Sequence, residues 1–252
     1  SEAVAQARCG GGPTLIWCDV DRLSSHSSVD DHRIYRGEEE VAAMSGRDPV
    51  ARFEALLIGE GLLTEGQRDA LHAGTQAEVR AAYEEAASME PPGEGDALSE
   101  VLGPEPEAEV PAIEPDAAGR MVDAVNAVFR KALQDDERTV VFGEDVEEPM
   151  GGVFKLTVGL SQEFPGRVVN APLAEATIAG VCCGLATYGK RPLCELPFVD
   201  FAGPAWNQIV TNLATLRWRT NGQWKASLVV YAPCVAYLPG GAIWHSQANE
   251  AL

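Results

Sequence analysis

Three short stretches of the sequence carry residues whose chemistry could serve catalysis or ligand binding. Glu175 stands at the predicted start of a helix, where a carboxylate complements the helix dipole. If it is aimed into a cleft, the same carboxylate could hold or donate a proton at neutral pH. His245 follows a glycine pair and precedes Ser246 and Gln247, so it is either a structural group or an acid–base.

The third stretch, residues 22–36, reads RLSSHSSVDDHRIYR and is too polar to be held together by burial. Serine and aspartate favour turns by bonding to their own backbone, which is typical of a solvent loop. Histidine and arginine side chains could instead face a charged ligand such as a phosphate. The pattern by itself leaves both interpretations open.

The composition limits the partners that the chain can have. Its 252 residues sum to a formal charge of −19, which argues against a general attraction to nucleic acid or anionic membranes. A hydrophobic content of 46% allows a folded core, and the six cysteines show no CxxC pairing. No apolar stretch is long enough to span a membrane. We therefore predict a soluble, cytoplasmic protein with reduced cysteines.

Residues 90–116 predict a spacer between two parts of the chain. The stretch is dominated by proline, glycine and acidic residues and contains no lysine or arginine. Such a segment cannot bury enough apolar area to offset its ordering entropy, and proline-rich, self-repelling chain tends to extend. We predict a first part at residues 1–88, a linker at 89–118 and a second domain at 119–252.

The first part is predicted to be mainly helical. An apolar run at residues 13–20 reads as a short strand, and helices follow the polar loop. The Asp-Pro pair at 48–49 predicts the start of one helix. Thr64 and Gln67 form a capping box that opens a second helix, which runs to about Ser88.

Strands alternate with helices in the second domain. Apolar residues recur every three or four positions over residues 121–133, as in an amphipathic helix. This alternation predicts a doubly wound, mostly parallel α/β sheet whose ligands lie at the carboxyl ends of its strands. The segments that then share one edge of the sheet are residues 143–145, 172–175, 197–201 and 231–241.

Two further features of this domain allow more than one interpretation. Phe201 follows Asp200 at a strand end, where an aromatic is part of a lid or core, or a platform for a flat ring. Gly180 and Gly184 lie four positions apart in a predicted helix. Because glycine lowers helix stability, the pair predicts close approach of another helix, within the domain or across a subunit interface; a loosely packed core helix is the alternative.

The order of these elements along the chain resembles a known family. The succession GEDV…GGVFKLTVGL…APLAEATIAG…LPFVDFAGP…APC…GG…HSQ, over about residues 121–252, resembles the β chain of the thiamine-diphosphate-dependent decarboxylating component of 2-oxo acid dehydrogenase complexes. The stretch GPTLIW…HSSVDDHRIYRGEEE is similar to the carboxyl-terminal tail of its α chain. The resemblance implies a thiamine-diphosphate-binding fold in a single-chain fusion, with a pyrimidine-binding domain preceded by a small helical α-chain tail.

The resemblance also implies roles for residues of the second domain. Glu175 of PLAE matches the glutamate that hydrogen-bonds the aminopyrimidine ring and so promotes removal of the thiazolium proton. Phe201 matches the aromatic residue packed against that ring. His245 of HSQ matches a histidine at the mouth of the active site, which binds the 2-oxo acid or assists acylation of the lipoyl group.

In the first part, the resemblance implies a loop beside the cofactor's diphosphate. His26 matches the histidine of that loop, and Arg22, Tyr35 and Arg36 match its anchoring, cofactor-binding positions. The main ligands of Mg²⁺ are expected in a Gly-Asp-Gly segment upstream of Ser1, so no metal ligand is predicted in this chain. We expect the loop to be poorly ordered without the cofactor and that upstream domain.

Within the family, HSSxDD…YR and APC…GG…HSQ…EAL are most similar to branched-chain 2-oxo acid dehydrogenase, that is, 3-methyl-2-oxobutanoate dehydrogenase. This implies oxidative decarboxylation of a branched-chain 2-oxo acid, a lipoyl-bearing acyltransferase core as partner, and a homodimer or an α2β2-like assembly. Pyruvate and acetoin dehydrogenase components, transketolase-like carboligation and a non-catalytic assembly fragment are the alternatives. Since the β chain's carboxyl-terminal domain is also expected beyond Leu252, we expect this chain alone to be incomplete.

Overall fold

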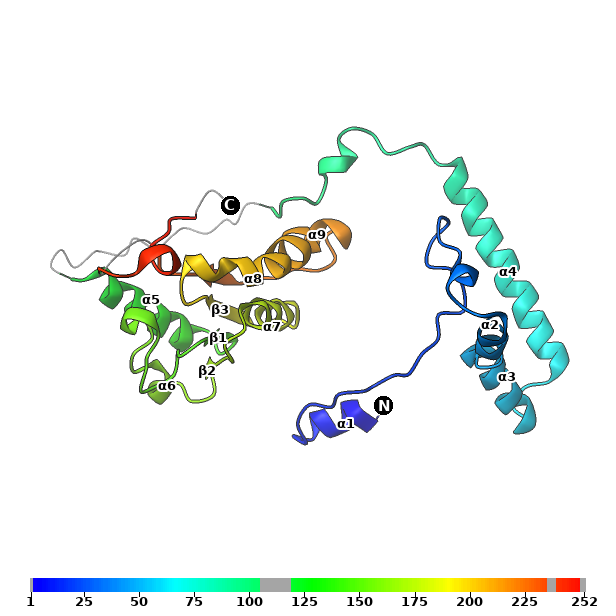
Figure 1. The fold of residues 1–252 in the computed structure, drawn as a ribbon, viewed down its shortest axis with the longest axis horizontal. Helices are drawn as coiled ribbons and strands as arrows, with labels where there is room; N and C mark the ends of the chain where they lie inside the picture. Colours follow the sequence, from blue (N-terminus) through cyan, green and yellow to red (C-terminus); the bar gives the residue numbers. More distant parts are fainter. Residues whose placement is uncertain (1, 105–118, 235–238, 250–252) are drawn as a thin grey trace. The chain divides into compact units, whose positions relative to one another are not determined.

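The computed structural model describes residues 2–104, 119–234 and 239–249, which fall into two units (Figure 1). The first unit spans Ser1–Pro91 and the second spans Pro92–Leu252. Because residues 105–118 lie outside the described ranges, the predicted linker limits of 89–118 stay a prediction. Within the described ranges, no helix is both long enough and apolar enough to cross a membrane.

The first unit is built mainly from helices. These are α1 (Glu2–Arg8), α2 (Glu38–Ser45), α3 (Pro49–Gly59) and α4 (Glu65–Ser88), with a 3-10 turn at His32–Ile34. The predicted start of α3 is confirmed, since the Asp48 carboxylate accepts a hydrogen bond from the backbone N–H of Val50 at 2.9 Å. The capping box of Thr64 and Gln67 is also confirmed, and α4 ends at Ser88 as predicted.

The predicted strand at residues 13–20 is wrong. The chain has no regular secondary structure there, and Leu15 and Trp17 are 91% and 89% exposed. An apolar run becomes a stable strand only where neighbouring strands satisfy its backbone groups. The described residues of the first unit contain no other strand that could do so.

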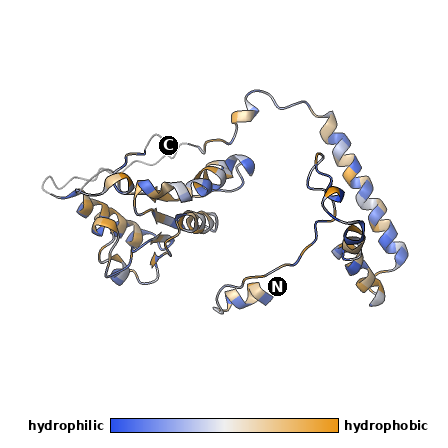
Figure 2. Ribbon diagram, in the orientation of Figure 1, coloured by the Kyte–Doolittle hydropathy of each residue, from blue (hydrophilic) through white to orange (hydrophobic). Residues whose placement is uncertain are grey.

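The long helix α4 is exposed over its whole length. Figure 2 shows hydrophilic residues along most of it, and none of its residues is buried. Its contact with α3 includes a hydrogen bond between His72 Nε2 and Glu54 Oε1 at 2.6 Å. Among the described residues of the first unit, Met44 is the one buried apolar side chain. This unit therefore has almost no apolar core of its own.

The second unit contains a parallel α/β sheet, as predicted. Its strands are β1 (Thr139–Gly143), β2 (Val168–Asn170), β3 (Arg191–Glu195) and β4 (Val229–Tyr231). All three strand pairings are parallel, in the order β2-β1-β3-β4. The helices are α5 (Met121–Asp135), α6 (Leu160–Glu163), α7 (Glu175–Thr187), α8 (Ala202–Asn207) and α9 (Ala214–Arg219). A π-helical segment, η5 (Gln208–Leu213), joins α8 to α9.

Different helices cover the two faces of the sheet. On one face, Val141 of β1 packs in a cluster with Phe129 and Leu133 of α5. On the other, Cys194 of β3 packs in a second cluster with Ile178 of α7. Successive side chains of a strand point to opposite faces, so the central strands β1 and β3 contribute to both clusters. The sheet is thereby fixed between two layers of helices, which is the doubly wound arrangement.

The predicted close approach of a helix to Gly180 occurs inside this unit. Helix α7 packs against α8 and η5, and a Cβ atom at Gly180 would lie 3.5 Å from the side chain of Gln208. No described atom would lie within 4 Å of a Cβ at Gly184. Gly180 therefore faces η5 across this contact, whereas Gly184 lies on an exposed part of α7.

Candidate active site

The carboxyl ends of the parallel strands gather the predicted site segments of the second unit. Gly143 of β1 is in register with Asn170 of β2 and with Glu195 of β3, and Glu195 is in register with Tyr231 of β4. The segments that follow these residues therefore start from one edge of the sheet, as predicted. Part of the fourth segment, residues 235–238, lies outside the described residues.

Two carboxylates stand close together at this edge. Glu144 follows β1 directly, and half-buried Glu175 is the first residue of α7. Partial burial raises the pKa of Glu144, and the negative charges of Asp145 and Glu175 raise it further. A carboxyl group that keeps its proton more readily beside a second carboxylate can share in proton transfer.

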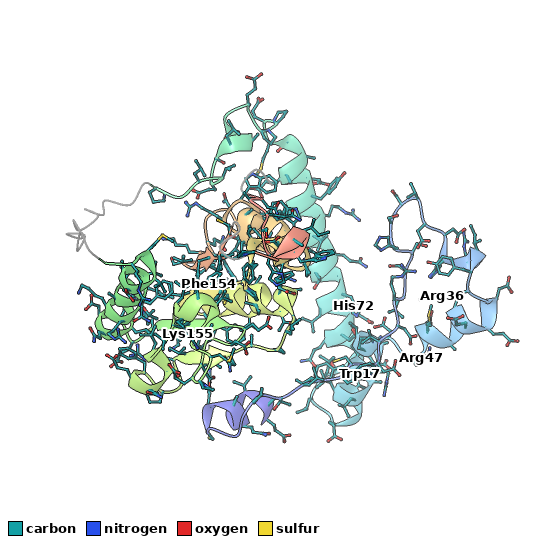
Figure 3. The ribbon with its side chains drawn as sticks, turned by 60° about the vertical axis from the view of Figure 1, so that its left-hand side comes forward. Trp17, Arg36, Arg47, His72, Phe154 and Lys155 are labelled. Atoms are coloured by element: carbon teal, nitrogen blue, oxygen red, sulfur yellow. The ribbon has the colours of Figure 1, made fainter. Side chains whose placement is uncertain are left out.

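An aromatic cluster surrounds the imidazole of His245. The centroid of its ring lies 4.8 Å from that of Phe198 and 5.3 Å from that of Phe201, with interplanar angles of 85° and 87°. Phe198 also meets Phe154 edge-on at 5.8 Å, and Phe154 is labelled in Figure 3. Edge-to-face packing of this kind is favourable and fixes the ring planes. The structure thus brings His245 and Phe201 together and adds Phe154 and Phe198, which the sequence did not single out.

Asp200 holds the turn that carries His245. Its Oδ1 atom accepts hydrogen bonds from the backbone N–H groups of Ser246 at 3.2 Å and Gln247 at 3.1 Å. Its Oδ2 atom is buried and has no hydrogen-bond partner among the described residues. A Cβ atom at Gly241 would collide with the Ser246 hydroxyl and lie 3.1 Å from the His245 carbonyl oxygen, so a larger residue there would have to displace part of this turn.

Glu195 is a buried acid at the same edge that sequence reasoning missed. Its carboxylate accepts hydrogen bonds from the Tyr231 hydroxyl at 2.6 Å and from the backbone N–H of Val153 at 3.2 Å. Burial raises the pKa of Glu195, and these two hydrogen bonds oppose the rise. Gly152 has a φ of 74°, and a Cβ there would lie 2.7 Å from the Thr157 hydroxyl. The available signal was an acid inside an otherwise apolar strand, which is rarely buried without partners.

The polar loop of the first unit is bonded to itself. The Tyr35 hydroxyl accepts a hydrogen bond from Arg22 Nη2 at 2.5 Å and donates to Asp30 Oδ2 at 2.9 Å. Asp30 Oδ2 also accepts from the backbone N–H of His26 at 2.7 Å, and Arg36 Nη1 donates to the carbonyl of Arg22 at 2.8 Å. Several polar side chains of the loop thus bond to other parts of the same loop, while its poor ordering stays a prediction.

The same bonds show how the predicted cofactor-binding residues of the loop are placed. Arg22, Tyr35 and Arg36 form hydrogen bonds within the loop, whereas His26 is exposed. Their contact with a diphosphate stays a prediction. Across the described ranges of the chain, no group of three or more His, Cys, Asp or Glu side chains could hold a metal ion.

Comparison with known protein families agrees with this architecture. Residues 118–236 match the family model described as transketolase, pyrimidine binding domain. Residues 1–94 match the model described as dehydrogenase E1 component. Together the two matches, which do not overlap, cover most of the chain.

Several relatives carry the names of dehydrogenase β subunits. The 2-oxoisovalerate dehydrogenase subunit beta of Bacillus subtilis is 46% identical over 134 residues, which is 52% of this chain and 40% of the relative. The pyruvate dehydrogenase E1 component subunit beta of Leifsonia xyli is 43% identical over 52% of this chain and 39% of the relative. The 3-methyl-2-oxobutanoate dehydrogenase subunit beta of Mycobacterium tuberculosis is 41% identical over 52% of this chain and 37% of the relative. The chain thus spans about two fifths of the length of these relatives.

Proposed function

We propose that the chain is part of the decarboxylating component of a branched-chain 2-oxo acid dehydrogenase complex. The reaction is oxidative decarboxylation of a branched-chain 2-oxo acid, followed by acyl transfer to a lipoyl group on an acyltransferase core. The observation that carries the proposal is the edge of the parallel sheet at which Glu175 opens α7 and His245 packs against Phe201. Assembly as a homodimer or an α2β2-like oligomer belongs to the same proposal.

The residues at this edge fit the pyrimidine half of thiamine diphosphate. When bound, the cofactor supplies the electron sink for decarboxylation. Phe201 offers an aromatic ring for packing against a flat heterocycle. Glu175 is proposed to hold a proton at a ring nitrogen. The raised pKa of the neighbouring Glu144 supports this proposal, because a second carboxyl group that keeps its proton more readily lies beside Glu175.

His245 is proposed to bind the 2-oxo acid and to move a proton at its imidazole. Phe198 and Phe201 fix the plane of the ring, and Asp200 fixes the turn behind it. A held imidazole needs little reorganisation during the reaction, which favours acid–base catalysis.

The loop of the first unit is proposed to serve the diphosphate. The exposed imidazole of His26 is available for a phosphate oxygen, and Arg22 and Arg36 add positive charge to the loop that Tyr35 helps to anchor. Mg²⁺, with its main ligands supplied from upstream of this chain, completes the proposed cofactor site.

The decisive variant is Glu175→Gln in the complete enzyme. We expect decarboxylation to fall by about 10²-fold or more, the range for loss of a proton-transferring group, while the circular dichroism spectrum is unchanged. Glu137→Gln is the matched control, because Glu137 is an exposed glutamate that precedes β1 at the opposite edge of the sheet. Activity of Glu175→Gln equal to that of the control would remove Glu175 from the mechanism.

Pyruvate is the second candidate substrate, because a pyruvate dehydrogenase subunit is nearly as similar to this chain as the 2-oxoisovalerate dehydrogenase subunit. Comparing kcat/KM for 3-methyl-2-oxobutanoate and for pyruvate separates the two. We expect a clear preference for 3-methyl-2-oxobutanoate. A preference for pyruvate refutes the branched-chain assignment and leaves the proposed site intact.

A further inference from the structure

A pocket of about 400 Å³ opens at the amino ends of the strands. Its notable lining residues are Arg138, Lys190, Arg191, Trp224 and Lys225. Arg138 precedes β1, Arg191 begins β3, and Lys225 precedes β4, so the parallel sheet brings them to one edge. The candidate active site occupies the other edge. A five-residue strand places roughly 15 Å between the two edges.

The pocket is locally positive in a chain whose formal charge is −19. Arg138 and Arg191 share one carboxylate, with Arg138 Nη2 and Arg191 Nε lying 2.8 and 3.3 Å from Asp136 Oδ2. Lys190 and Lys225 form no ion pair with any residue that the structure describes. The four cationic side chains of the pocket are thus accompanied by one carboxylate, that of Asp136, which pairs with the two arginines. The two lysines are available to a further anion.

Trp224 gives the pocket an aromatic surface. The residue is 56% exposed, and its backbone N–H donates to the Thr220 hydroxyl at 3.2 Å, which fixes its place after α9. An exposed indole offers a large flat face on which a planar ring can stack. Gln223 and Ser227 also line the pocket and supply polar groups for the edge of such a ring.

We propose that this pocket binds a phosphate-bearing ligand with a planar ring, of the nucleotide class. The phosphate lies against Lys190, Lys225 and the guanidinium groups held by Asp136, and the ring stacks on Trp224. None of these residues belongs to the candidate active site. The proposal therefore stands or falls independently of the proposed function.

Calorimetric titration of the 252-residue chain with ADP, pyrophosphate and adenosine tests the proposal. We expect one saturable ADP site per chain, with pyrophosphate and adenosine each binding more weakly because each lacks one half of the ligand. The double variant Lys190→Gln/Lys225→Gln should weaken ADP binding by about tenfold or more, as expected for lost charge-assisted bonds. Trp224→Ala should weaken binding of ADP and leave that of pyrophosphate unchanged.

The control variant is Lys131→Gln, an exposed lysine on α5 that pairs with Asp135 outside the pocket; it should bind ADP like the wild type. Unchanged far-UV circular dichroism spectra exclude unfolding of the variants. Three results would overturn the proposal: no saturable ADP binding, ADP binding that the double variant does not weaken, or displacement of ADP by thiamine diphosphate. Binding of a hexaglutamate peptide without binding of ADP would also overturn it and indicate a contact with an acidic protein segment.

Discussion

The interactions that stabilise the first unit differ in kind from those that stabilise the second. In the first, helices carry good caps and surface ion pairs, and Met44 is the one buried apolar side chain among the described residues. In the second, two apolar clusters lie on opposite faces of a parallel sheet. Surface ion pairs contribute little to stability and caps contribute about 1 kcal/mol each, whereas burial of large apolar side chains contributes several times more.

The candidate site residues of the two units are accordingly held in place by different means. In the second unit, Glu175 begins α7, which packs in the cluster around Ile178, and Phe201 and Asp200 hold His245 and its turn. The candidate site residues of this unit are therefore held by the unit itself. The loop of the first unit is held by short-range polar bonds among Arg22, Asp30 and Tyr35. Substitutions should accordingly have large effects on the stability of the second unit and small ones on that of the first.

The largest expected effect is in the core of the second unit. Ile178→Ala removes a fully buried side chain from the cluster around α7 and should lower the free energy of unfolding by about 2–5 kcal/mol. Leu71→Ala on exposed α4 is the comparison and should change it by less than about 1 kcal/mol. Urea unfolding monitored by circular dichroism measures both. Equal effects of the two variants would contradict the difference drawn between the units.

A somewhat smaller effect is expected at the buried acid. Glu195→Ala leaves the Tyr231 hydroxyl and the Val153 N–H without their acceptor, which should lower the free energy of unfolding by about 1–3 kcal/mol. Glu195→Gln retains the shape and one acceptor oxygen and should recover part of this loss. The same urea titration checks both, and an Ala variant as stable as the wild type would show that these bonds do not stabilise the unit.

Glu195 should also make stability depend on pH. Burial raises its pKa above the ordinary value of 4.5, so between the two values the folded protein keeps a proton that the unfolded chain has lost. Stability therefore falls as pH rises through that window and levels off above the raised pKa. Unfolding free energies of the wild type and Glu195→Gln, measured from pH 4 to pH 8, should diverge across it. Parallel curves would rule out a raised pKa.

The smallest effect belongs to the first unit. Thr64→Ala removes the capping box of α4 and should cost about 1 kcal/mol of helix stability. Amide hydrogen exchange should speed up in the first turns of α4 and stay unchanged in β1 and β3. Faster exchange in the sheet would mean that the two units are more closely coupled than their separate interactions indicate.

Local signals explain which features the sequence could predict. The Asp48 cap and the Thr64 capping box involve residues three or fewer positions apart, and the parallel sheet follows from the alternation of strands and helices. The strand expected at residues 13–20 failed because pairing depends on a distant partner. Two further contacts could not be predicted for the same reason, since each joins residues 36 or more positions apart. They are the edge-on contact of Phe154 with Phe198 and the hydrogen bond from Tyr231 to Glu195.

The central claim is that Glu175 promotes removal of the thiazolium proton of bound thiamine diphosphate. The most direct measurement is the rate of hydrogen–deuterium exchange at that carbon in the complete enzyme, with cofactor occupancy confirmed by calorimetry. We expect Glu175→Gln to slow this exchange by about 10²-fold or more, while Glu137→Gln exchanges like the wild type. Exchange at the wild-type rate in cofactor-loaded Glu175→Gln would contradict it.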